Sequence, residues 1–401
     1  MLYRLEIENY SSIRDPQILD LTIAPNVPDH EGRFTPIFPG SSLRVPKVVA
    51  IYGANASGKT TVLKALASLF QFIGGSASDP QRGVPMFPFN DKEHISKPIR
   101  LAIEFGTQLN LRPEMDTNKT VVGCMRYELE LEAENGRATK VLSETLRQRP
   151  DGKGKWQRIF ERDITGIVLG SSNFQMSNYG HLVKTLRENA SVLSSFAFFD
   201  HPNAKIYADT ASRVWLYFKD RLRENAALEF LAASPAILEK LNADLNRIDI
   251  GIESLKFDPS ANGPQALFTH AGLQSDLGWQ FQSQGTKEFI KVFPTLALTL
   301  EQGSVGIIDE FDTLFHPLML PEILSWFYNK SRNPLNAQVW LSCHSASLMD
   351  DLCKEEIVIT EKDFDGRTSI FSLMDIKDVR RGDNLAKKYL GGVYGGVPTF
   401  G

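Results

Sequence analysis

The chain has 401 residues, of which 42% are hydrophobic and 23% are charged, as is usual for a folded globular protein. No stretch approaches the roughly 18 consecutive apolar residues of a membrane span, and the first residues lack the apolar core of a secretory signal. The formal charge of −4 argues against a generally basic nucleic-acid coat, and the three scattered cysteines show no metal-ligand spacing. We therefore expect a cytoplasmic protein with two domains, or with one large domain and an insertion.

The first regular pattern is that of two short strands around a turn. Leu5 and Ile7 alternate with charged residues, and the alternation returns over 19–23, after Asp15 and Pro16 break the chain. Five prolines within 24–47 then predict a surface loop that leads into the next strand.

The most informative stretch is an apolar run, 48–52, followed by a loop with the spacing G-x-x-x-x-G-K-T and then by a helical pattern. The two glycines of such a loop allow a tight turn in which backbone N–H groups point at an anion. Lys59 would bring a positive charge to the β- and γ-phosphates of a nucleoside triphosphate, and the Thr60 hydroxyl would bind Mg²⁺. A strand before the loop and a helix after it are the context that a phosphate site requires. The residues expected to contact ATP are Gly53, Ala54, Asn55, Ala56, Ser57, Gly58, Lys59, Thr60 and Thr61.

Alternating segments at 99–105 and 125–131 predict strands of an antiparallel sheet. The segment 137–163 then carries eight Lys or Arg residues against four acids. This basic segment is the best candidate for contact with an acidic partner such as DNA. A solvated face is nevertheless the preferred interpretation, because the segment has turn residues and few aromatic side chains on which bases could stack.

From about 180 to 247 the pattern becomes helical. We expect Trp215, Phe218 and Leu222 to share one helical face, and Ser234 and Pro235 to begin a further helix. No heptad repeat is sustained, so the sequence does not encode a long coiled-coil arm.

A second apolar run, 304–308, ends in two acids, Asp309 and Glu310. A carboxylate at such a strand end can hold Mg²⁺, and the next carboxylate can orient or deprotonate the attacking water. We assign Asp309, with Thr60, to the metal and Glu310 to the water. Taken alone, this pattern also fits the end of a surface strand, but a phosphate loop in the same chain favours the catalytic interpretation.

A third apolar run, 338–342, is followed by His344. A histidine just past a strand end, on the side of the phosphate loop, can donate a hydrogen bond to a γ-phosphate. A structural histidine is the alternative interpretation. His344 therefore joins Lys59 and Glu310 as a candidate catalytic residue.

The order of these motifs resembles the ABC-type ATPase head shared by RecF-, SMC- and OLD-like proteins. There, a Ser-x-Gly element opens a helix and reaches across a dimer to the γ-phosphate of the partner's ATP. Ser283 and Gly285 match that element, His344 matches the switch histidine, and Asp312 matches the dimer-contacting loop. The resemblance implies an α/β fold, namely a P-loop NTPase of ABC-ATPase type with a mixed central sheet, an antiparallel β subdomain and a helical insertion.

Within that group the chain is similar to the compact AAA/ABC-type ATPases of prokaryotic abortive-infection and phage-defence systems, the AbiL/RloA-like proteins and the ATPase of PARIS. The resemblance rests on the segments 53–60, 285–287, 309–312 with 316–317, 336–338 and the tail 389–398. Pro294 and Pro321 depart from the pattern, and each predicts a kink or a later helix start. We expect an N-terminal lobe over 1–170, a helical insertion over 171–249 and a C-terminal lobe over 250–401.

The resemblance implies an ATP-hydrolysing sensor that uses Mg²⁺ and forms an ATP-dependent homodimer or larger assembly. Its partners would be a separate effector encoded nearby, a toxin or a nuclease, and a phage-derived trigger, with no membrane partner. One alternative is a RecF- or SMC-like DNA-binding repair ATPase. A nuclease in its own right is a further alternative, but few residues follow His344 and no acids cluster there.

Overall fold

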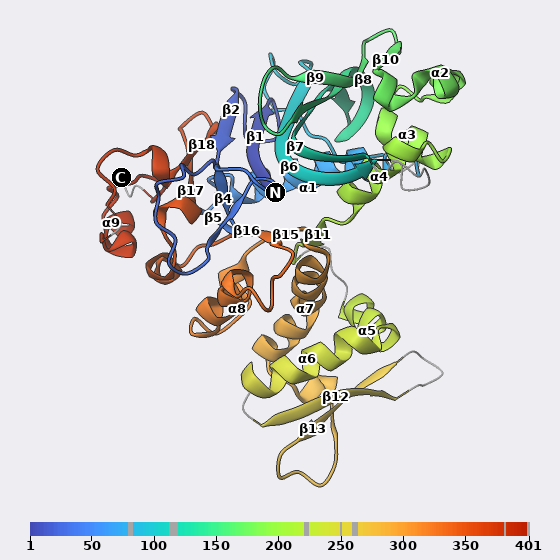
Figure 1. Ribbon diagram of the computed structural model, residues 1–401. Coiled ribbons are helices and arrows are strands. Elements are labelled where there is room, and N and C mark those ends of the chain that lie inside the picture. The colour runs from blue at the N-terminus through green and yellow to red at the C-terminus, as the bar shows by residue number, and fades with distance from the viewer. Residues whose placement is uncertain are drawn as a thin grey trace.

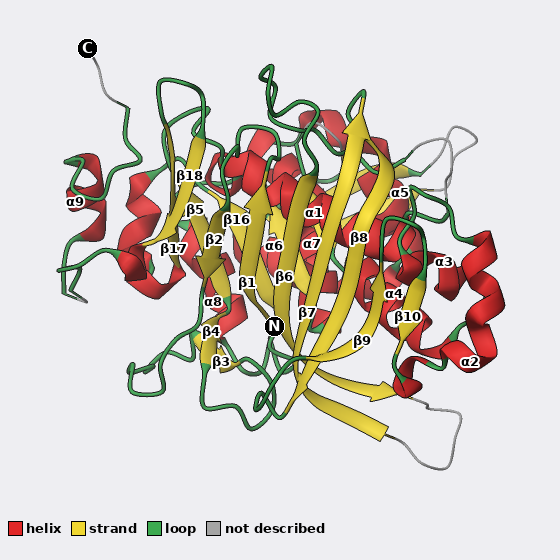
Figure 2. Ribbon diagram, turned by 90° about the horizontal axis from the view of Figure 1, so that it is seen from above, coloured by secondary structure: helices red, strands yellow, loops and turns green. Residues whose placement is uncertain are grey.

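The phosphate loop and the helix that follows it lie between two large β-sheets, as Figures 1 and 2 show. The computed structural model describes residues 1–78, 83–111, 119–219, 224–248, 251–258, 264–380 and 382–398. Among these residues, no helix is both long enough and apolar enough to span a membrane.

The central sheet has six strands in the order β11-β15-β16-β5-β17-β18. Its neighbouring strands are parallel, except that β18 runs antiparallel to β17. The carboxyl ends of β5, β15 and β16, each predicted as a buried strand, therefore meet at one edge of the sheet. In chain order the strands are β5 (Val48–Tyr52), β11 (Trp215–Tyr217), β15 (Val305–Ile308), β16 (Gln338–Ser342), β17 (Ile357–Lys362) and β18 (Thr368–Ser372).

The second sheet is antiparallel throughout, with the order β10-β9-β8-β7-β6-β1-β2. The strands predicted over 2–23, 99–105 and 125–131 are confirmed, and two of them are longer than predicted. The strands are β1 (Leu2–Glu8), β2 (Gln17–Asp20), β6 (Ile99–Leu111), β7 (Lys119–Glu134), β8 (Arg137–Pro150), β9 (Gln157–Arg162) and β10 (Val168–Gly170). The mixed central sheet and the antiparallel sheet together confirm the predicted fold class.

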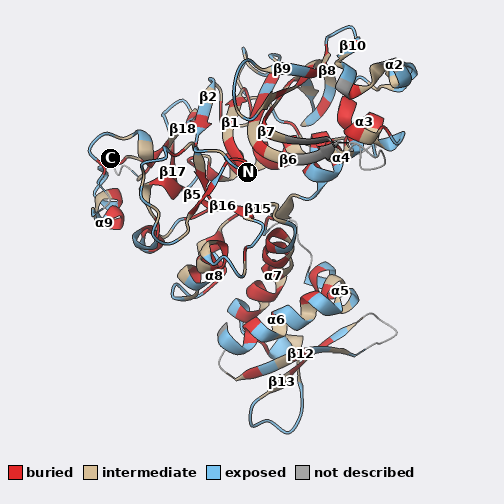
Figure 3. Ribbon diagram, viewed as in Figure 1, coloured by how far each residue is buried: buried red, intermediate tan, exposed pale blue. Residues whose placement is uncertain are grey.

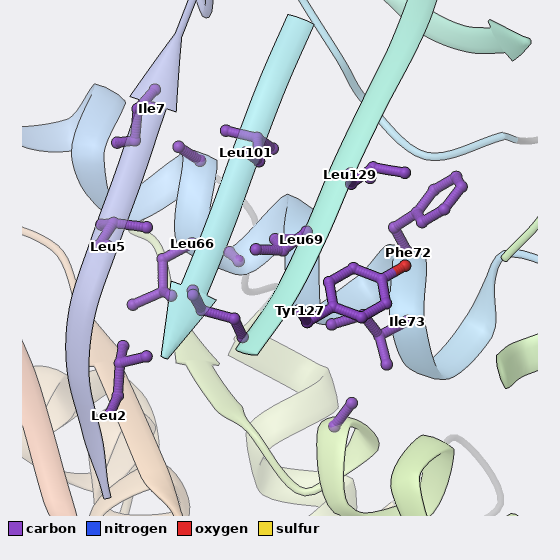
Figure 4. Packing of buried hydrophobic residues seen from close by; sticks show 14 of the residues in the cluster. Leu2, Leu5, Ile7, Leu66, Leu69, Phe72, Ile73, Leu101, Tyr127 and Leu129 are labelled. Atoms are coloured by element: carbon purple, nitrogen blue, oxygen red, sulfur yellow. The ribbon is translucent and has the colours of Figure 1, made fainter. Parts of the chain in front are cut away.

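Helix α1 (Lys59–Gly75) joins the two sheets through one hydrophobic core. Figure 4 shows Leu66, Leu69 and Phe72 of α1 facing side chains of β1, β6 and β7. Because each large apolar side chain removed from water contributes roughly 1.5–3 kcal/mol, this packing holds the helix firmly behind the phosphate loop.

A second core covers the other face of the central sheet. In β5, Val49 and Ile51 face α1, whereas Val48, Ala50 and Tyr52 face this second core, as the period of a strand requires. Its helices are α7 (Gln284–Gln302), α8 (Met319–Tyr328), α5 (Glu224–Ala233) and α6 (Pro235–Ile248). Helix α6 packs with a small sheet of β12 (Ile252–Asp258), β13 (Gln265–His270) and β14 (Leu277–Gly278). Buried and exposed residues are interspersed along β12 (Figure 3).

Two expectations about local structure are wrong. Trp215 does not lie on a helix, because Trp215–Tyr217 forms the edge strand β11 beside β15; Leu222 lies outside the described residues. The loop 24–47 contains a two-stranded hairpin, β3 (Phe34–Pro36) and β4 (Arg44–Pro46). In both cases pairing with a neighbouring strand outweighs the local pattern.

The helix α6 begins at Pro235, as predicted. Pro321 lies in the first turn of α8, where its missing N–H costs little, and α7 continues through Pro294 as one helix. The remaining helices are α2 (Met176–Tyr179), α3 (Val192–Phe198), α4 (Pro202–Ser212) and α9 (Leu385–Leu390). The boundaries 1–170, 171–249 and 250–401 stay predictions.

Candidate functional site

The two glycines of the phosphate loop lie where no side chain fits. A Cβ atom at Gly53 would lie 2.4 Å from both Ser57 Oγ and the Thr360 carbonyl oxygen, and one at Gly58 would lie 2.4 Å from Thr368 Oγ1. Gly58 also has a φ of +114°, which L side chains rarely adopt. Contacts with β17 and β18 thus set the shape of the loop.

The Lys59 side chain folds back over the loop. Its Nζ donates to the Gly53 carbonyl at 2.8 Å and to the Ala54 carbonyl at 3.0 Å. Burial lowers the pKa of this ammonium group, while Asp312 and Asp309 oppose that shift. The geometry therefore places a buried cation at the mouth of the loop, where phosphate oxygens could replace the two carbonyl acceptors.

Thr60, Asp309 and Ser342 form a hydrogen-bonded group at the carboxyl edge of the central sheet. Thr60 Oγ1 donates to the Asp309 carboxylate, 3.0 Å from each oxygen. Ser342 Oγ donates to Asp309 Oδ1 at 2.5 Å and accepts from the Glu310 N–H at 2.7 Å. These contacts bring together the two residues predicted to hold the metal.

Glu310 has a left-handed backbone, with a φ of 54°. A residue other than glycine is rarely found there, and the conformation costs of order 1–3 kcal/mol unless neighbouring contacts impose it. The bond from its N–H to Ser342 is one such contact. Glu310 and His344 line the same cavity as the phosphate loop.

That cavity has a volume of about 780 Å³, which suits a nucleotide-sized ligand. Its lining is polar and contains residues 55–61, Glu310, His344, Lys362, Ser11 and Ser12. Gly53 and Ala54 contribute the two carbonyls that Lys59 binds. The structure thus brings the predicted residues of the phosphate loop, Glu310 and His344 to one place.

The donor set fits a magnesium ion. The Thr60 hydroxyl and the Asp309 carboxylate supply the hard oxygen ligands that Mg²⁺ prefers, and this ion usually takes its other ligands from phosphates and water. In the part of the chain that the structure describes, no three His, Cys, Asp or Glu side chains cluster as a metal site. The arrangement therefore suits a metal that arrives with a nucleotide.

Asp312 binds within its own chain. Its Oδ2 accepts from the backbone N–H of His344 at 2.7 Å and from that of Ser345. The carboxylate therefore holds the loop that carries His344. Its predicted role as a contact to a second subunit stays a prediction.

Ser283 and Gly285 lie at the start of α7, as predicted. Ser283 is the N-cap of the helix, and its Oγ accepts from the Thr286 N–H at 3.1 Å. Gly285 is exposed. Neither residue is among the described residues that line the phosphate cavity of the same chain.

Several hydroxyl residues that support the phosphate loop were not predicted from the sequence. Ser57 Oγ lies 2.7 Å from Thr360 Oγ1, Thr368 Oγ1 donates to the Ser57 carbonyl at 2.8 Å, and Ser12 Oγ lies 3.1 Å from Thr61 Oγ1. A polar residue within the apolar run 357–360 was an available signal. The partners themselves lie too far away in the sequence to be recognised.

Much of the basic segment 137–163 is engaged within the chain. Arg147 pairs with Glu128 at 2.9 Å, and the Arg149 guanidinium lies 4.6 Å from the centre of the Trp156 ring. Arg162 is buried and donates to the Ala190 carbonyl at 2.6 Å. These contacts favour a structural role for these three arginines over contact with DNA.

The mixed central sheet and this cavity define a P-loop NTPase fold. The family model described as "AAA domain, putative AbiEii toxin, Type IV TA system" matches residues 48–350, and the chain belongs to this family. No curated protein matches the chain.

Among solved structures, the chain is similar to SMC head domains. An SmcHead bound to the C-winged helix domain of ScpA is 13% identical with a TM-score of 0.46, over 92% of this chain and 96% of that one. The SMC head domain from Thermotoga maritima is 13% identical with a TM-score of 0.44, over 92% and 98%. A head with an extended coiled coil, bound to the C-terminal domain of ScpA derived from Pyrococcus furiosus, is 14% identical with a TM-score of 0.41, over 98% and 99%.

Proposed function

We propose that the protein binds ATP with Mg²⁺ in the cavity of the phosphate loop, hydrolyses it, and dimerises around it to control a separate effector in phage defence. One observation carries the proposal: Thr60, at the start of α1, donates to Asp309, at the end of β15, beside Lys59 and Glu310. Groups suited to bind phosphate, hold a metal and activate water thus meet at one cavity.

Each residue has a role that follows from its chemistry. The Lys59 ammonium exchanges its two carbonyl acceptors for phosphate oxygens, and backbone N–H groups of the loop point at the same anion. Thr60 and Asp309 hold Mg²⁺, which neutralises phosphate charge when it is bound.

Glu310 accepts the proton of the attacking water, and its backbone is held in place by Ser342. The His344 side chain donates to the γ-phosphate, and Asp312 holds the loop that carries it. Both residues lie at ends of parallel strands, which keep their positions fixed while the ligand changes.

The positions of Ser283 and Gly285 support the proposed dimer. Ser283 and Gly285, at the start of a 19-residue helix, are not among the described residues that line the cavity of the same chain. A helix start of this kind suits an anion, and the partner's γ-phosphate is that anion. ATP would therefore join two subunits by being bound from both sides.

The effector and the defence role rest on the family. Its description names an abortive-infection toxin and a toxin–antitoxin system, which suits an ATPase that restrains or releases a toxin or nuclease encoded nearby. A cytoplasmic location and a phage-derived trigger belong to the same proposal.

Lys59→Ala tests the nucleotide site. The variant should still fold, because Lys59 belongs to neither hydrophobic core. We expect ATP hydrolysis to fall to background. ATP affinity is measured separately, by titration calorimetry in the presence of Mg²⁺. Wild-type hydrolysis by a folded Lys59→Ala protein would contradict the assignment.

Coexpression tests the effector. The product of the neighbouring reading frame should differ in toxicity to the host cell between coexpression with the wild-type protein and coexpression with the Lys59→Ala variant. Equal toxicity in both cases would show that the ATPase does not control this effector. Filter binding of duplex DNA, with and without ATP, tests the alternative of a DNA-binding ATPase.

A further inference from the structure

A second cavity, of about 650 Å³, lies at the far end of α1 from the phosphate loop. It is lined by Phe70 and Ile73 of α1, by residues of β6, β7 and α4, and by the first residues of β15. Figure 4 shows Ile73 and Tyr127, from α1 and β7, close to each other at this end of the helix. The nucleotide proposal leaves this cavity unused.

The lining of this cavity is mostly apolar, but two hydroxyl groups in it have no partner. Tyr207 is 5% exposed, and its Oη is buried without a hydrogen bond in the structure. Ser304 Oγ is likewise buried and without a partner. A buried hydroxyl that is left without a partner costs free energy, so a ligand that bonds with these groups would gain from them.

The charge of the lining also discriminates between ligands. Among the described residues that line the cavity, Arg213 carries the only charged side chain. It is exposed and directly follows the end of α4. The site therefore favours an anionic head group near Arg213 and disfavours a cation, which would find no carboxylate.

We propose that this cavity binds a small apolar molecule that carries one anionic head group. The apolar body would lie against Phe70, Ile73 and the sheet, and the head group would accept from Tyr207, Ser304 or Arg213. The volume is within the range of sites for small ligands, and the mixture of an apolar wall with a few polar groups is typical of them.

The location suggests what such a ligand would do. Helix α1 begins at Lys59, and β15 leads directly to Asp309 and Glu310, so a molecule wedged between their far ends contacts both elements that carry the catalytic groups. This regulatory consequence rests on the proposed ATPase function, whereas binding itself does not.

Binding is measured with 1-anilinonaphthalene-8-sulfonate, which has an apolar body and one sulfonate, and with decanoate as a competitor. We expect saturable binding of one dye molecule per chain and displacement by decanoate. Tyr207→Phe removes only the hydroxyl and should weaken decanoate binding about fivefold, the loss expected for one hydrogen bond. Decanol, which lacks the charge, should compete at least tenfold more weakly.

Ala211→Trp fills the cavity, because Ala211 is buried on α4 and lines it. Asp209→Trp is the matched control, since Asp209 is exposed on the same helix and is not a lining residue. Dye binding should be lost in the first variant and kept in the second. Val214→Trp, at a half-buried lining position, replaces Ala211→Trp if that protein fails to fold.

Equal dye binding by a folded cavity-filled variant and by the control would overturn the site. Equal affinity for decanol and decanoate would overturn the anionic head group. If dye binding follows the proposal in a protein that hydrolyses no ATP, the cavity stands and the proposed ATPase function fails. If ATP is hydrolysed but no dye binds, the proposed ATPase function stands and the ligand site in this cavity fails.

Discussion

Thr60 and Asp309 lie 249 positions apart in the chain, yet the Thr60 hydroxyl donates to both oxygens of the Asp309 carboxylate at 3.0 Å. This contact joins the first turn of α1 to the end of β15. In the central sheet, β16 lies between β15 and β5, the strand that leads into the phosphate loop and α1, so the contact depends on the pairing of these three strands. The same two oxygen-bearing groups suit a magnesium ion.

Ser342→Ala tests how this group is held together. Ser342 is fully buried, and its hydroxyl bonds with both Asp309 and the Glu310 N–H. Its removal leaves a partly buried N–H without this acceptor, which should lower the free energy of unfolding by about 1 kcal/mol. Hydrolysis should fall further than ATP affinity, because Glu310 loses its support.

Ser347→Ala is the control for Ser342→Ala, since Ser347 is an exposed serine a few residues further along the chain. Urea unfolding and steady-state ATPase rates measure the two effects. If Ser342→Ala and Ser347→Ala behave alike in both assays, Ser342 does not support Asp309 and Glu310.

Glu310→Gln should bind ATP normally but hydrolyse it about 100-fold more slowly or worse. The amide can orient a water molecule but cannot accept its proton. The variant should therefore accumulate as an ATP-bound dimer, which sedimentation velocity with and without ATP detects. Hydrolysis at the wild-type rate would assign the general base to another residue.

Asp312→Ala removes the acceptor for the backbone N–H groups of His344 and Ser345. The loop should then lose its fixed position, and hydrolysis should fall about tenfold or more, as when one stabilising donor at an active site is displaced. Asp312→Asn keeps one carbonyl acceptor and should retain more activity. Stopped-flow measurements compare the ATP hydrolysis rates of the two variants. A faster rate for Asp312→Ala than for Asp312→Asn would contradict the role of Asp312 in holding the loop.

The candidate site was largely predictable because its motifs are local. The phosphate loop with Lys59, and the strand that ends in Asp309 and Glu310, each occupy fewer than about ten consecutive residues, so spacing and flanking patterns identify them. The antiparallel strands were predictable for a similar reason, since alternation within one strand shows which face is buried.

What the sequence did not reveal depends on pairing across long distances. Trp215 belongs to a three-residue edge strand that exists only because β15 lies beside it. The hydroxyls of Thr360 and Thr368 shape the phosphate loop from about 300 residues away. Thr360 is a polar residue at the end of an apolar run, but the sequence does not show that its partner is the phosphate loop.

A buried histidine makes stability depend on pH. His201 is fully buried: its Nε2 bonds with the Phe174 carbonyl at 2.8 Å, and its Nδ1 accepts from the Ala204 N–H at 3.1 Å. Burial lowers the pKa of this imidazole below its usual 6.5. As pH falls below about 6.5, the unfolded chain takes up a proton that the folded chain resists, so stability is lost by up to about 1.4 kcal/mol per pH unit until the folded pKa is reached.

His201→Asn isolates this effect, because asparagine can still cap α4 but does not titrate in this range. The free energy of unfolding of both proteins is measured at pH 7.5 and at lower pH. The quantity compared is the loss of stability of each protein between these pH values. The wild-type protein should lose more stability than the variant as pH falls. Parallel losses would show that His201 does not drive the dependence.

The shared ATP site is tested most directly by mixing two inactive proteins. Ser283→Arg places a bulky cation at the start of α7, and Lys59→Ala disables the phosphate loop; each protein alone should be inactive. A mixed dimer would hold one intact site, built from Lys59 of one chain and Ser283 of the other. With random pairing, an equal mixture should recover about a quarter of the wild-type rate, because about half of the dimers are mixed and each has one working site of two. The measurement is the ATPase rate against mixing ratio, with a maximum predicted at equal amounts; a flat, inactive response from folded proteins that still associate would contradict a site shared between subunits.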